Sequence, residues 1–354
     1  ASMKNVVKTD GSKFSSCFVY GAGRVESNWG LLGRCSDGHS LRFDVPVNKS
    51  PKIDVVSDII RPALEDNLIR DGFIALASSH DDKPVLAASA SSIQWAWVYP
   101  FGSNVPLDLK RPDLSSQVPS SGTVDFGASI SVASLADGGH MVVVGAPKYG
   151  SLWLYKMAAS GVLENNGKPW GCLAGMSKEF GRHIFTGQLL GDSTEELMVS
   201  DSGKVRVFDV NSLALSPMGD TCSVLYPTNS LISSIACNDT ESVTGCDLTR
   251  AEFGRSLAIG DLDGDGMKEL LVGLPSLSTP FGRAAGAVLV YRVTNDGKPP
   301  AILETRYVTS ADEGDGLGYS VASLRIGNRD VLAAGSPGAG SSASPGAGGG
   351  PRPP

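Results

Sequence analysis

The sequence predicts an all-β protein built from repeated units, and three observations support this fold class. Short segments with alternating apolar and polar residues, rich in β-branched and aromatic types, recur along the chain, and a period of two is typical of β-strands. The 43 glycines and 21 prolines among 354 residues indicate many turns between these segments. A common frame of glycine, strand, loop and second strand also occurs several times. Helix-rich folds are therefore disfavoured.

The repeated frame is clearest where an aromatic residue or leucine precedes a glycine. Such copies begin at Phe126, Phe180, Phe253 and Leu317, and a fainter copy begins at Gly72. In each copy an apolar strand leads into a loop and then into a second apolar strand. Three of the copies end this second strand in Gly-x-Pro. We interpret each copy as one structural repeat.

An aromatic-rich strand follows the frame in most copies, at 94–99, 152–155, 205–208 and 287–291. The glycines that open the four clear copies are 54, 73 and 64 residues apart. Repeats of this size with about four strands each are typical of a β-propeller, in which the sheets pack as blades around an axis. The sequence therefore predicts a β-propeller of six or seven four-stranded blades, the seventh lying in the long interval from 181 to 254.

The N-terminal region is expected to complete this propeller. Cys17–Gly21 has the pattern of a strand, and the last repeat lacks its own outer strand, so we expect the two to pair and close the ring. In the alternative, residues 1–20 are a frayed terminus and the ring stays open. Residues 21–70 are expected to form an irregular first blade. Within them, the apolar spacing of Ile53–Asp71 predicts a short helix interrupted by Pro62.

Two further segments fall outside the repeat. Residues 212–250 are expected to form an extended loop inserted in the propeller. Residues 339–354 are rich in glycine, proline and serine and cannot pack, so the propeller domain is assigned to 1–338. The tail is interpreted as a linker within a longer surface protein, or as a tag.

The loop of the Phe253 copy carries a pattern of metal ligands. Asp261, Asp263 and Asp265 alternate with other residues, a glycine permits a sharp turn, and Glu269 follows. Ca2+ takes six to eight oxygen ligands, and a short carboxylate-rich loop can supply them. We expect side-chain oxygens from the three aspartates and Glu269 and a backbone carbonyl from Met267. Carboxylates crowded this closely repel one another unless a cation neutralises them, which favours a metal over an empty acidic turn.

Other metal loops are less well supported. The spacing resembles the start of an EF-hand, but the flanking segments have the pattern of strands, and position twelve is Val272. The loop of the Phe180 copy keeps Asp192 and Glu196 but has Gln188 and Leu190 at two ligand positions. The remaining loops are too short or too basic. One calcium site is therefore predicted.

These motifs resemble the FG-GAP repeat of integrin α-subunit head domains, which also occurs in the C-terminal part of glycosylphosphatidylinositol-specific phospholipase D and in some fungal lectins. The resemblance covers roughly residues 70–340 and is strongest over Phe253–Pro275. It implies a propeller with a structural calcium at Asp261, Asp263, Asp265, Met267 and Glu269. It also implies that this loop lies away from the rim that binds a protein or glycan ligand.

Composition and motifs favour a non-enzymatic binding or adhesion module. The net charge of −7 argues against a nucleic-acid or anionic-membrane surface, and no apolar run approaches 18 residues. Four histidines are too few for a zinc phospholipase domain, and nucleophile and phosphate-binding motifs are absent from the sequence. The alternatives are the propeller of a larger phospholipase D-like hydrolase and a carbohydrate-binding propeller. Trp29, Trp170 and Tyr226 could stack on ligands, although structural packing is the favoured interpretation.

Six widely spaced cysteines are compatible with three disulfides, and the alternative is buried free thiols in a cytosolic protein. Sequons at Asn48 and Asn238 fit a glycoprotein. We therefore expect an extracellular or cell-surface protein.

Overall fold

The structure, a computed structural model, describes residues 2–3, 17–25, 28–35, 40–46, 54–59, 72–78, 84–91, 94–100, 107–112, 125–175, 177–192, 194–214, 230–236, 252–279, 282–294, 301–306, 313–326 and 329–339. The chain divides into two compact units, which we treat separately. Unit 1 comprises residues 1–188, 192–201 and 207–232, and unit 2 comprises 189–191, 202–206 and 233–354. The described strands form six sheets, and nearly all regular structure is β.

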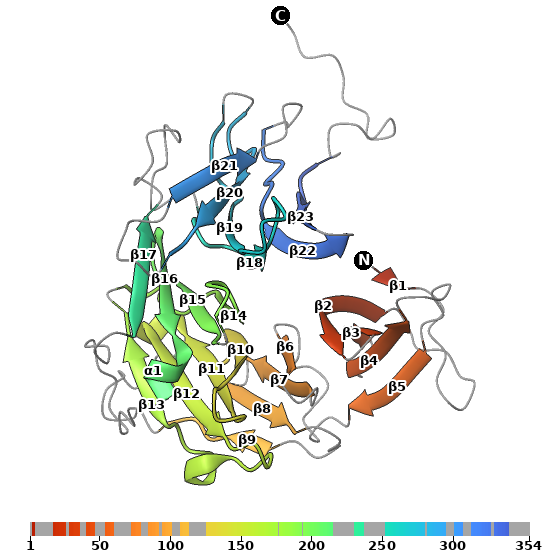
Figure 1. The fold of residues 1–354 in the computed structure, drawn as a ribbon, viewed down its shortest axis with the longest axis vertical. Helices are drawn as coiled ribbons and strands as arrows, with labels where there is room; N and C mark the ends of the chain where they lie inside the picture. Colours follow the sequence, from red (N-terminus) through yellow and green to blue (C-terminus); the bar gives the residue numbers. More distant parts are fainter. Residues whose placement is uncertain are drawn as a thin grey trace, which may run out of the picture. The chain divides into compact units, whose positions relative to one another are not determined.

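Three sheets lie wholly in unit 1 (Figure 1). Each is antiparallel and keeps its strands in sequence order. The first contains β1 (Ser2–Met3), β2 (Cys17–Val25), β3 (Asn28–Cys35), β4 (Ser40–Pro46) and β5 (Asp54–Ile59). The second contains β6 (Gly72–Ser78), β7 (Pro84–Ala90), β8 (Trp95–Tyr99) and β9 (Leu107–Leu109). The third contains β10 (Ser129–Ser134), β11 (His140–Ala146), β12 (Ser151–Met157) and β13 (Gly171–Ala174), with short 3-10 turns at Pro147–Tyr149 and Glu164–Gly167.

A fourth sheet, also with its strands in sequence order, contains β14 (Ile184–Gly187), β15 (Glu196–Ser200), β16 (Lys204–Asp209) and β17 (Leu231–Ala236). The five-residue helix α1 (Val210–Ala214) follows β16. The extended loop expected over 212–250 is therefore wrong in part, because this segment contains the end of α1 and all of β17. The β-branched residues Ile232 and Ile235 favour a strand in this segment.

Two sheets belong to unit 2. One contains β18 (Leu257–Gly260), β19 (Glu269–Leu274), β20 (Ala287–Arg292) and β21 (Ala301–Arg306), and the other is the hairpin of β22 (Ser320–Ile326) and β23 (Arg329–Gly335). All pairings are antiparallel. Four-stranded antiparallel sheets in sequence order are the blades of a β-propeller, and the predicted fold class is confirmed.

Two expectations for the N-terminal region are wrong. The strand predicted from Cys17 forms, but it pairs with β1 and β3 rather than with the last repeat. Only two residues separate β2 from β3, so a local hairpin forms at low loop-closure cost. The predicted helix over 53–71 is replaced at its start by β5, whose Val55 pairs with Phe43 of β4. Residues 60–71 lie outside the described part of the chain.

The third sheet shows why these sequences form strands. In β11 and β12 successive side chains alternate between two apolar clusters, one containing Val142, Val144 and Trp153 and the other Met141 and Val143. All five side chains are fully buried. Burial on both faces is expected for a sheet stacked between neighbours, and it explains why the strands are apolar throughout rather than on one side alone.

A serine–glycine contact recurs between successive repeats. In unit 1 Ser129 Oγ donates to the carbonyl oxygen of Gly181 at 2.6 Å, and in unit 2 Ser256 Oγ donates to that of Gly318 at 2.7 Å. The accepting glycines have φ values of 83° and 89°, which favour glycine. A glycine on the second strand faces each serine, and a Cβ at Gly273 would overlap the Gly318 carbonyl oxygen. The glycines of the repeat therefore allow the backbones of successive repeats to approach closely.

The remaining expectations about organisation lie largely outside the described residues. Of the predicted tail, 339–354, only Ala339 is described. Within the described part of the chain, no helix combines the length and the apolar character that a membrane span requires.

Candidate metal centre

The acidic loop connects the first two strands of a unit 2 sheet. Strands β18 and β19 pair in antiparallel fashion, with Gly260 opposite Glu269. The register therefore brings Asp261 and Glu269, at the two ends of the loop, to the same edge of the sheet. Asp261 is 4% exposed and Glu269 is 1% exposed. The hairpin thus positions two buried carboxylates by backbone pairing alone.

The loop folds around its own aspartates. Asp261 accepts hydrogen bonds from the backbone N–H of Gly264 at Oδ1 (2.7 Å) and of Gly266 at Oδ2 (3.3 Å). Asp263 Oδ1 accepts one from the N–H of Asp265 at 3.1 Å. Aspartates favour such local turns, and Gly264 and Gly266 adopt φ values of 81° and 88°, a region that favours glycine. The alternation of aspartate and glycine therefore builds a tight turn that gathers its carboxylates together.

The structure brings three of the predicted ligands together directly. Asp261, Asp263 and Asp265 each offer one oxygen within 4.8 Å of the others. Glu269 lies beside them, and its Oε2 accepts the N–H of Leu262 at 2.9 Å. Met267 is in the loop, with its N–H donated to Asp265 Oδ1 at 2.8 Å and its side chain 41% exposed. Ligation by its carbonyl oxygen stays a prediction.

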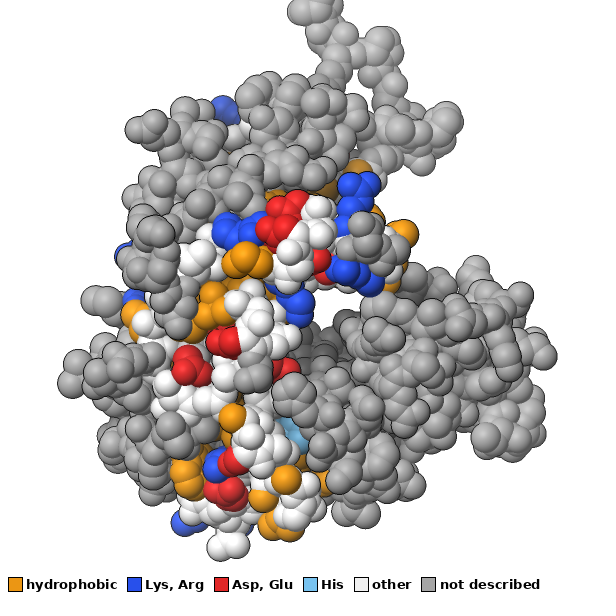
Figure 2. Space-filling view, viewed as in Figure 1, with side chains coloured by type: hydrophobic (Ala, Val, Ile, Leu, Met, Phe, Trp, Pro, Cys, Tyr) orange, Lys and Arg blue, Asp and Glu red, His pale blue; other side chains and the backbone are white. Residues whose placement is uncertain are grey.

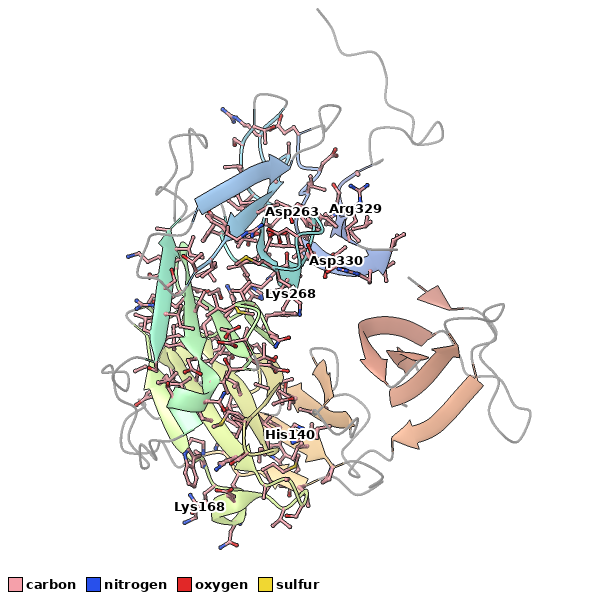
Figure 3. All side chains as sticks on the ribbon, viewed as in Figure 1. His140, Lys168, Asp263, Lys268, Arg329 and Asp330 are labelled. Carbon is pink, nitrogen blue, oxygen red and sulfur yellow. The ribbon has the colours of Figure 1, made fainter. Side chains whose placement is uncertain are left out.

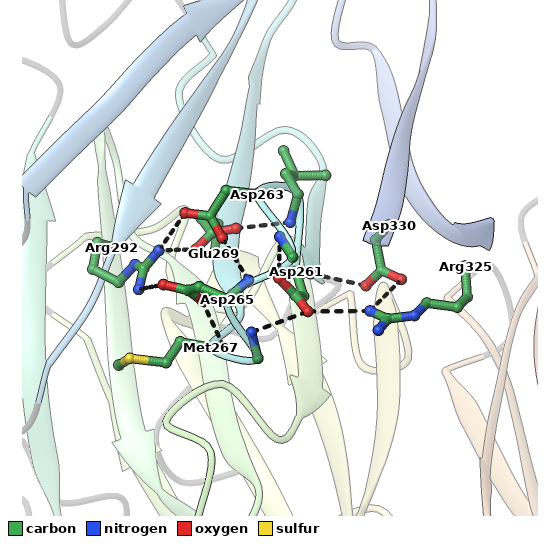
Figure 4. Close-up of polar contacts among 11 residues, drawn as sticks. Asp261, Asp263, Asp265, Met267, Glu269, Arg292, Arg325 and Asp330 are labelled. Atoms are coloured by element: carbon green, nitrogen blue, oxygen red, sulfur yellow. Dashed lines mark hydrogen bonds and ion pairs between the residues drawn. The ribbon is translucent and has the colours of Figure 1, made fainter. Parts of the chain in front are cut away.

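Two arginines that were not predicted contact the loop (Figure 4). Arg292, the last residue of β20, forms ion pairs with Asp263 Oδ2 (3.0 Å), Asp265 Oδ2 (2.8 Å) and Glu269 Oε1 (2.7 Å). Arg325, on β22, reaches Asp261 Oδ2 at 3.2 Å. In the space-filling view an acidic patch of unit 2 lies between basic side chains (Figure 2). Only the strand pairing reveals the position of Arg292. Tyr291 pairs with Leu270, so Arg292, the next residue, lies opposite Glu269.

Asp330, near the start of β23, is a fifth carboxylate at this site. Its Oδ2 accepts the N–H of Asp261 at 2.8 Å, and its own N–H donates to the Asp261 carbonyl oxygen at 2.7 Å. Asp330 also pairs with Arg325 at 3.4 Å. Figure 3 labels Asp263 of the loop and Asp330 of the hairpin. The hairpin of β22 and β23 thus holds one side of the loop.

Burial and charge act differently on two of the carboxylates. Burial raises the pKa of Glu269, with a smaller contribution from Asp263 and Asp265, although the N–H of Leu262 and Arg292 oppose it. The hydrogen bond from Arg292, followed by that from the N–H of Met267, lowers the pKa of Asp265. The same hydrogen bond to Asp265 raises the pKa of Arg292. Loss of hydration therefore outweighs the ion pair at the buried Glu269, whereas the ion pair outweighs it at Asp265.

The residues at this site fit a hard divalent cation. The donor set is made of carboxylate oxygens, which Ca2+ prefers. Five carboxylates face two guanidinium groups, an excess of three formal negative charges. The buried Glu269 Oε1 accepts no hydrogen bond among the described residues, and its neighbour is the ion-paired Arg292. A bound cation would supply positive charge where carboxylate repulsion is greatest.

The corresponding loops of the other repeats lack such a cluster. Among the described residues no other group of three acidic, histidine or cysteine side chains gathers its ligand atoms. Asp192 Oδ1 accepts hydrogen bonds from the N–H and hydroxyl of Thr194 instead. Asp137, in the loop before β11, pairs with Lys156 at 3.1 Å. The acidic side chains of these loops are thus partnered within the protein, by Thr194 of the same loop and by Lys156 of β12.

Comparison with known proteins identifies the repeat that holds the acidic loop. Residues 253–291 match the FG-GAP repeat family. None of the curated proteins matches the chain. The matched residues include β18, the acidic loop, β19 and β20 as far as Tyr291, the residue before Arg292.

Several solved structures are similar at low identity. A crystal structure of BBS1N in complex with ARL6DN has a TM-score of 0.43 and 14% identity, covering 91% of this chain and 89% of that chain. The periplasmic gluconolactonase PpgL of Pseudomonas aeruginosa has a TM-score of 0.43 and 12% identity, covering 82% and 70%. AofleA from Arthrobotrys oligospora has a TM-score of 0.43 and 10% identity, covering 92% and 84%. At these identities and scores the likenesses do not bear on function. Residues 253–291 thus match the FG-GAP repeat family, in a chain in which four of the six described sheets have the four-stranded antiparallel form of β-propeller blades.

Proposed function

We propose that the chain is a non-enzymatic, extracellular binding module in which the Asp261–Glu269 loop holds one Ca2+ as a structural brace. The observation that carries the proposal is the cluster of three aspartates between paired strands of an FG-GAP repeat. Asp261 of this cluster and the neighbouring Glu269 are buried at the sheet edge, and the loop is hydrogen-bonded to a second hairpin through Asp330. A cation there would join two sheets of unit 2, which suits a stabilising role.

The extracellular part of the proposal has independent support. Cys172 is fully buried and disulfide-bonded, and disulfides persist mainly in oxidising compartments. Calcium braces suit the same setting, because weak extracellular calcium sites are filled at the calcium concentrations found there. Ligand recognition is assigned to loops at one rim, since binding residues are concentrated on loops carried by a rigid scaffold. The partner would be a protein or a glycan.

Binding of the fluorescently labelled chain to intact cells tests this function. We expect saturable binding that is removed when the cells are first treated with protease. Absence of saturable binding would contradict the adhesion proposal, and binding that resists protease but is competed by a defined sugar would replace it with carbohydrate recognition. The variant Asp263→Asn, assayed well below its melting temperature, should bind equally well, because a brace does not touch the partner.

A further inference from the structure

Arg292 contacts the carboxylate oxygens of the loop that do not accept a backbone N–H group. Asp263 Oδ1, Asp265 Oδ1 and Glu269 Oε2 accept backbone N–H groups within the loop. The second oxygen of each of these carboxylates contacts Arg292, at 3.0, 2.8 and 2.7 Å. One guanidinium group therefore takes all three remaining oxygens. Its planar, forked donors suit such multiple contacts.

Arg292 is held in this position by its surroundings. Its side chain is 17% exposed, whereas Asp263 and Asp265 are 53% and 44% exposed. The preceding residue, Tyr291, is 1% exposed and packs edge-on against Phe253 with ring centroids 6.3 Å apart. The strand position of Arg292 is thus fixed by a buried aromatic pair. A cation presented from a rigid strand neutralises the loop at little entropic cost.

The same arrangement occurs in a second repeat. Tyr155 of β12 is fully buried and packs edge-on against Phe126 at 6.5 Å, and the next residue is Lys156. The ammonium group of Lys156 lies 3.1 Å from Asp137, in a loop that gathers no metal cluster among the described residues. A basic residue after the buried tyrosine of the third strand thus neutralises the loop in both repeats.

We propose that Arg292 is an internal counter-cation that competes with the divalent cation for Asp263, Asp265 and Glu269. This inference rests on the calcium brace proposed above. The loop then has two closed forms, one bridged by Arg292 and one holding the cation. The bridged form keeps the hairpin folded when calcium is scarce. It also weakens calcium binding, because Ca2+ must either bind close to the positively charged guanidinium group or displace it from the carboxylate oxygens.

Calcium titration of Arg292→Met by isothermal titration calorimetry tests the competition. Methionine keeps an unbranched apolar stem and removes the charge. We expect the calcium Kd of the variant to fall about tenfold or more below that of the wild type, and its melting temperature in EDTA to drop. Arg283→Met is the matched control: it removes the same charge from an exposed residue of unit 2 whose side chain has no described partner. Its calcium Kd should be unchanged.

The outcomes separate this inference from the proposed brace. If the wild type and Arg292→Met bind calcium with equal affinity, or the variant binds more weakly, the competition is overturned and the brace stands. If neither binds calcium, both are overturned. Arg292→Lys keeps the charge with fewer donors, so its Kd should lie between those of the wild type and Arg292→Met. A value outside that interval would also count against the competition.

Discussion

At the scale of single residues, the buried carboxylate of Glu269 shows how a charge is accommodated in the interior. Glu269 is almost fully buried, and the N–H of Leu262 and the guanidinium of Arg292 contact its two oxygens. His140, by contrast, is 4% exposed, and neither ring nitrogen has a hydrogen-bond partner among the residues that the structure describes. A buried histidine without a partner is more stable in its neutral form. The two residues therefore respond differently to pH.

His140 should make the stability of unit 1 depend on pH. Burial lowers the pKa of His140 below its usual value of 6.5, and Asp137 opposes this only in part. As the pH falls below 6.5, the unfolded chain binds a proton before the folded chain does, so the free energy of unfolding decreases. We expect the loss between roughly pH 7 and pH 5 to be smaller in His140→Met. Urea unfolding across this range, with the half-buried His183 changed to Gln as control, measures the effect. An unaltered pH profile in His140→Met would contradict it.

At the scale of elements, the serine–glycine contact joins successive repeats through the backbone. Each contact uses a serine hydroxyl, an accepting glycine carbonyl and a glycine on the second strand that leaves room for that carbonyl. A related contact is made from the second strand of the preceding sheet, where the hydroxyl of Ser89 on β7 donates to the Gly127 carbonyl oxygen at 2.9 Å. The hairpin of β22 and β23 repeats the serine and the second-strand glycine as Ser320 and Gly335.

Ser256→Ala should destabilise unit 2 by about 1 kcal/mol, because a partly buried hydrogen bond is lost and the Gly318 carbonyl oxygen loses its serine donor. Ser320→Ala is the matched control: Ser320 holds the same repeat position, is exposed, and donates no hydrogen bond within the described part of the chain. Its effect should stay within about 0.5 kcal/mol. Chemical denaturation of both variants gives the comparison. Equal losses would show that the contact does not stabilise the repeat.

How far the sequence predicts this structure depends on how local each signal is. Asp261, Asp263 and Asp265 were found because their spacing and the following glycine lie within one loop, and the structure brings them together. Arg292 and Arg325 were missed, because they reach the loop only through strand pairing and hairpin packing. Pairing of the strand from Cys17 was mispredicted because its nearest complementary strand follows after two residues. Periodicity identified strands well and their partners less well.

At the scale of the whole molecule, the chain is two compact units, and the acidic loop belongs to one of them. Within unit 2 the loop joins the four-stranded sheet to the hairpin of β22 and β23 through Asp330 and Arg325. A cation bound at this junction would stabilise unit 2 rather than unit 1. The thermal stability of unit 2 should therefore depend on calcium.

Differential scanning calorimetry of the chain in saturating calcium and in EDTA tests that claim most directly. A ligand that binds only the native state stabilises it by about 2.7 kcal/mol at a concentration one hundred times its Kd. We predict that calcium raises the melting temperature of one transition by several degrees, and that the paired substitution Asp263→Asn with Asp265→Asn abolishes the rise. Identical melting temperatures in calcium and EDTA, or an undiminished rise in the doubly substituted chain, would contradict the account.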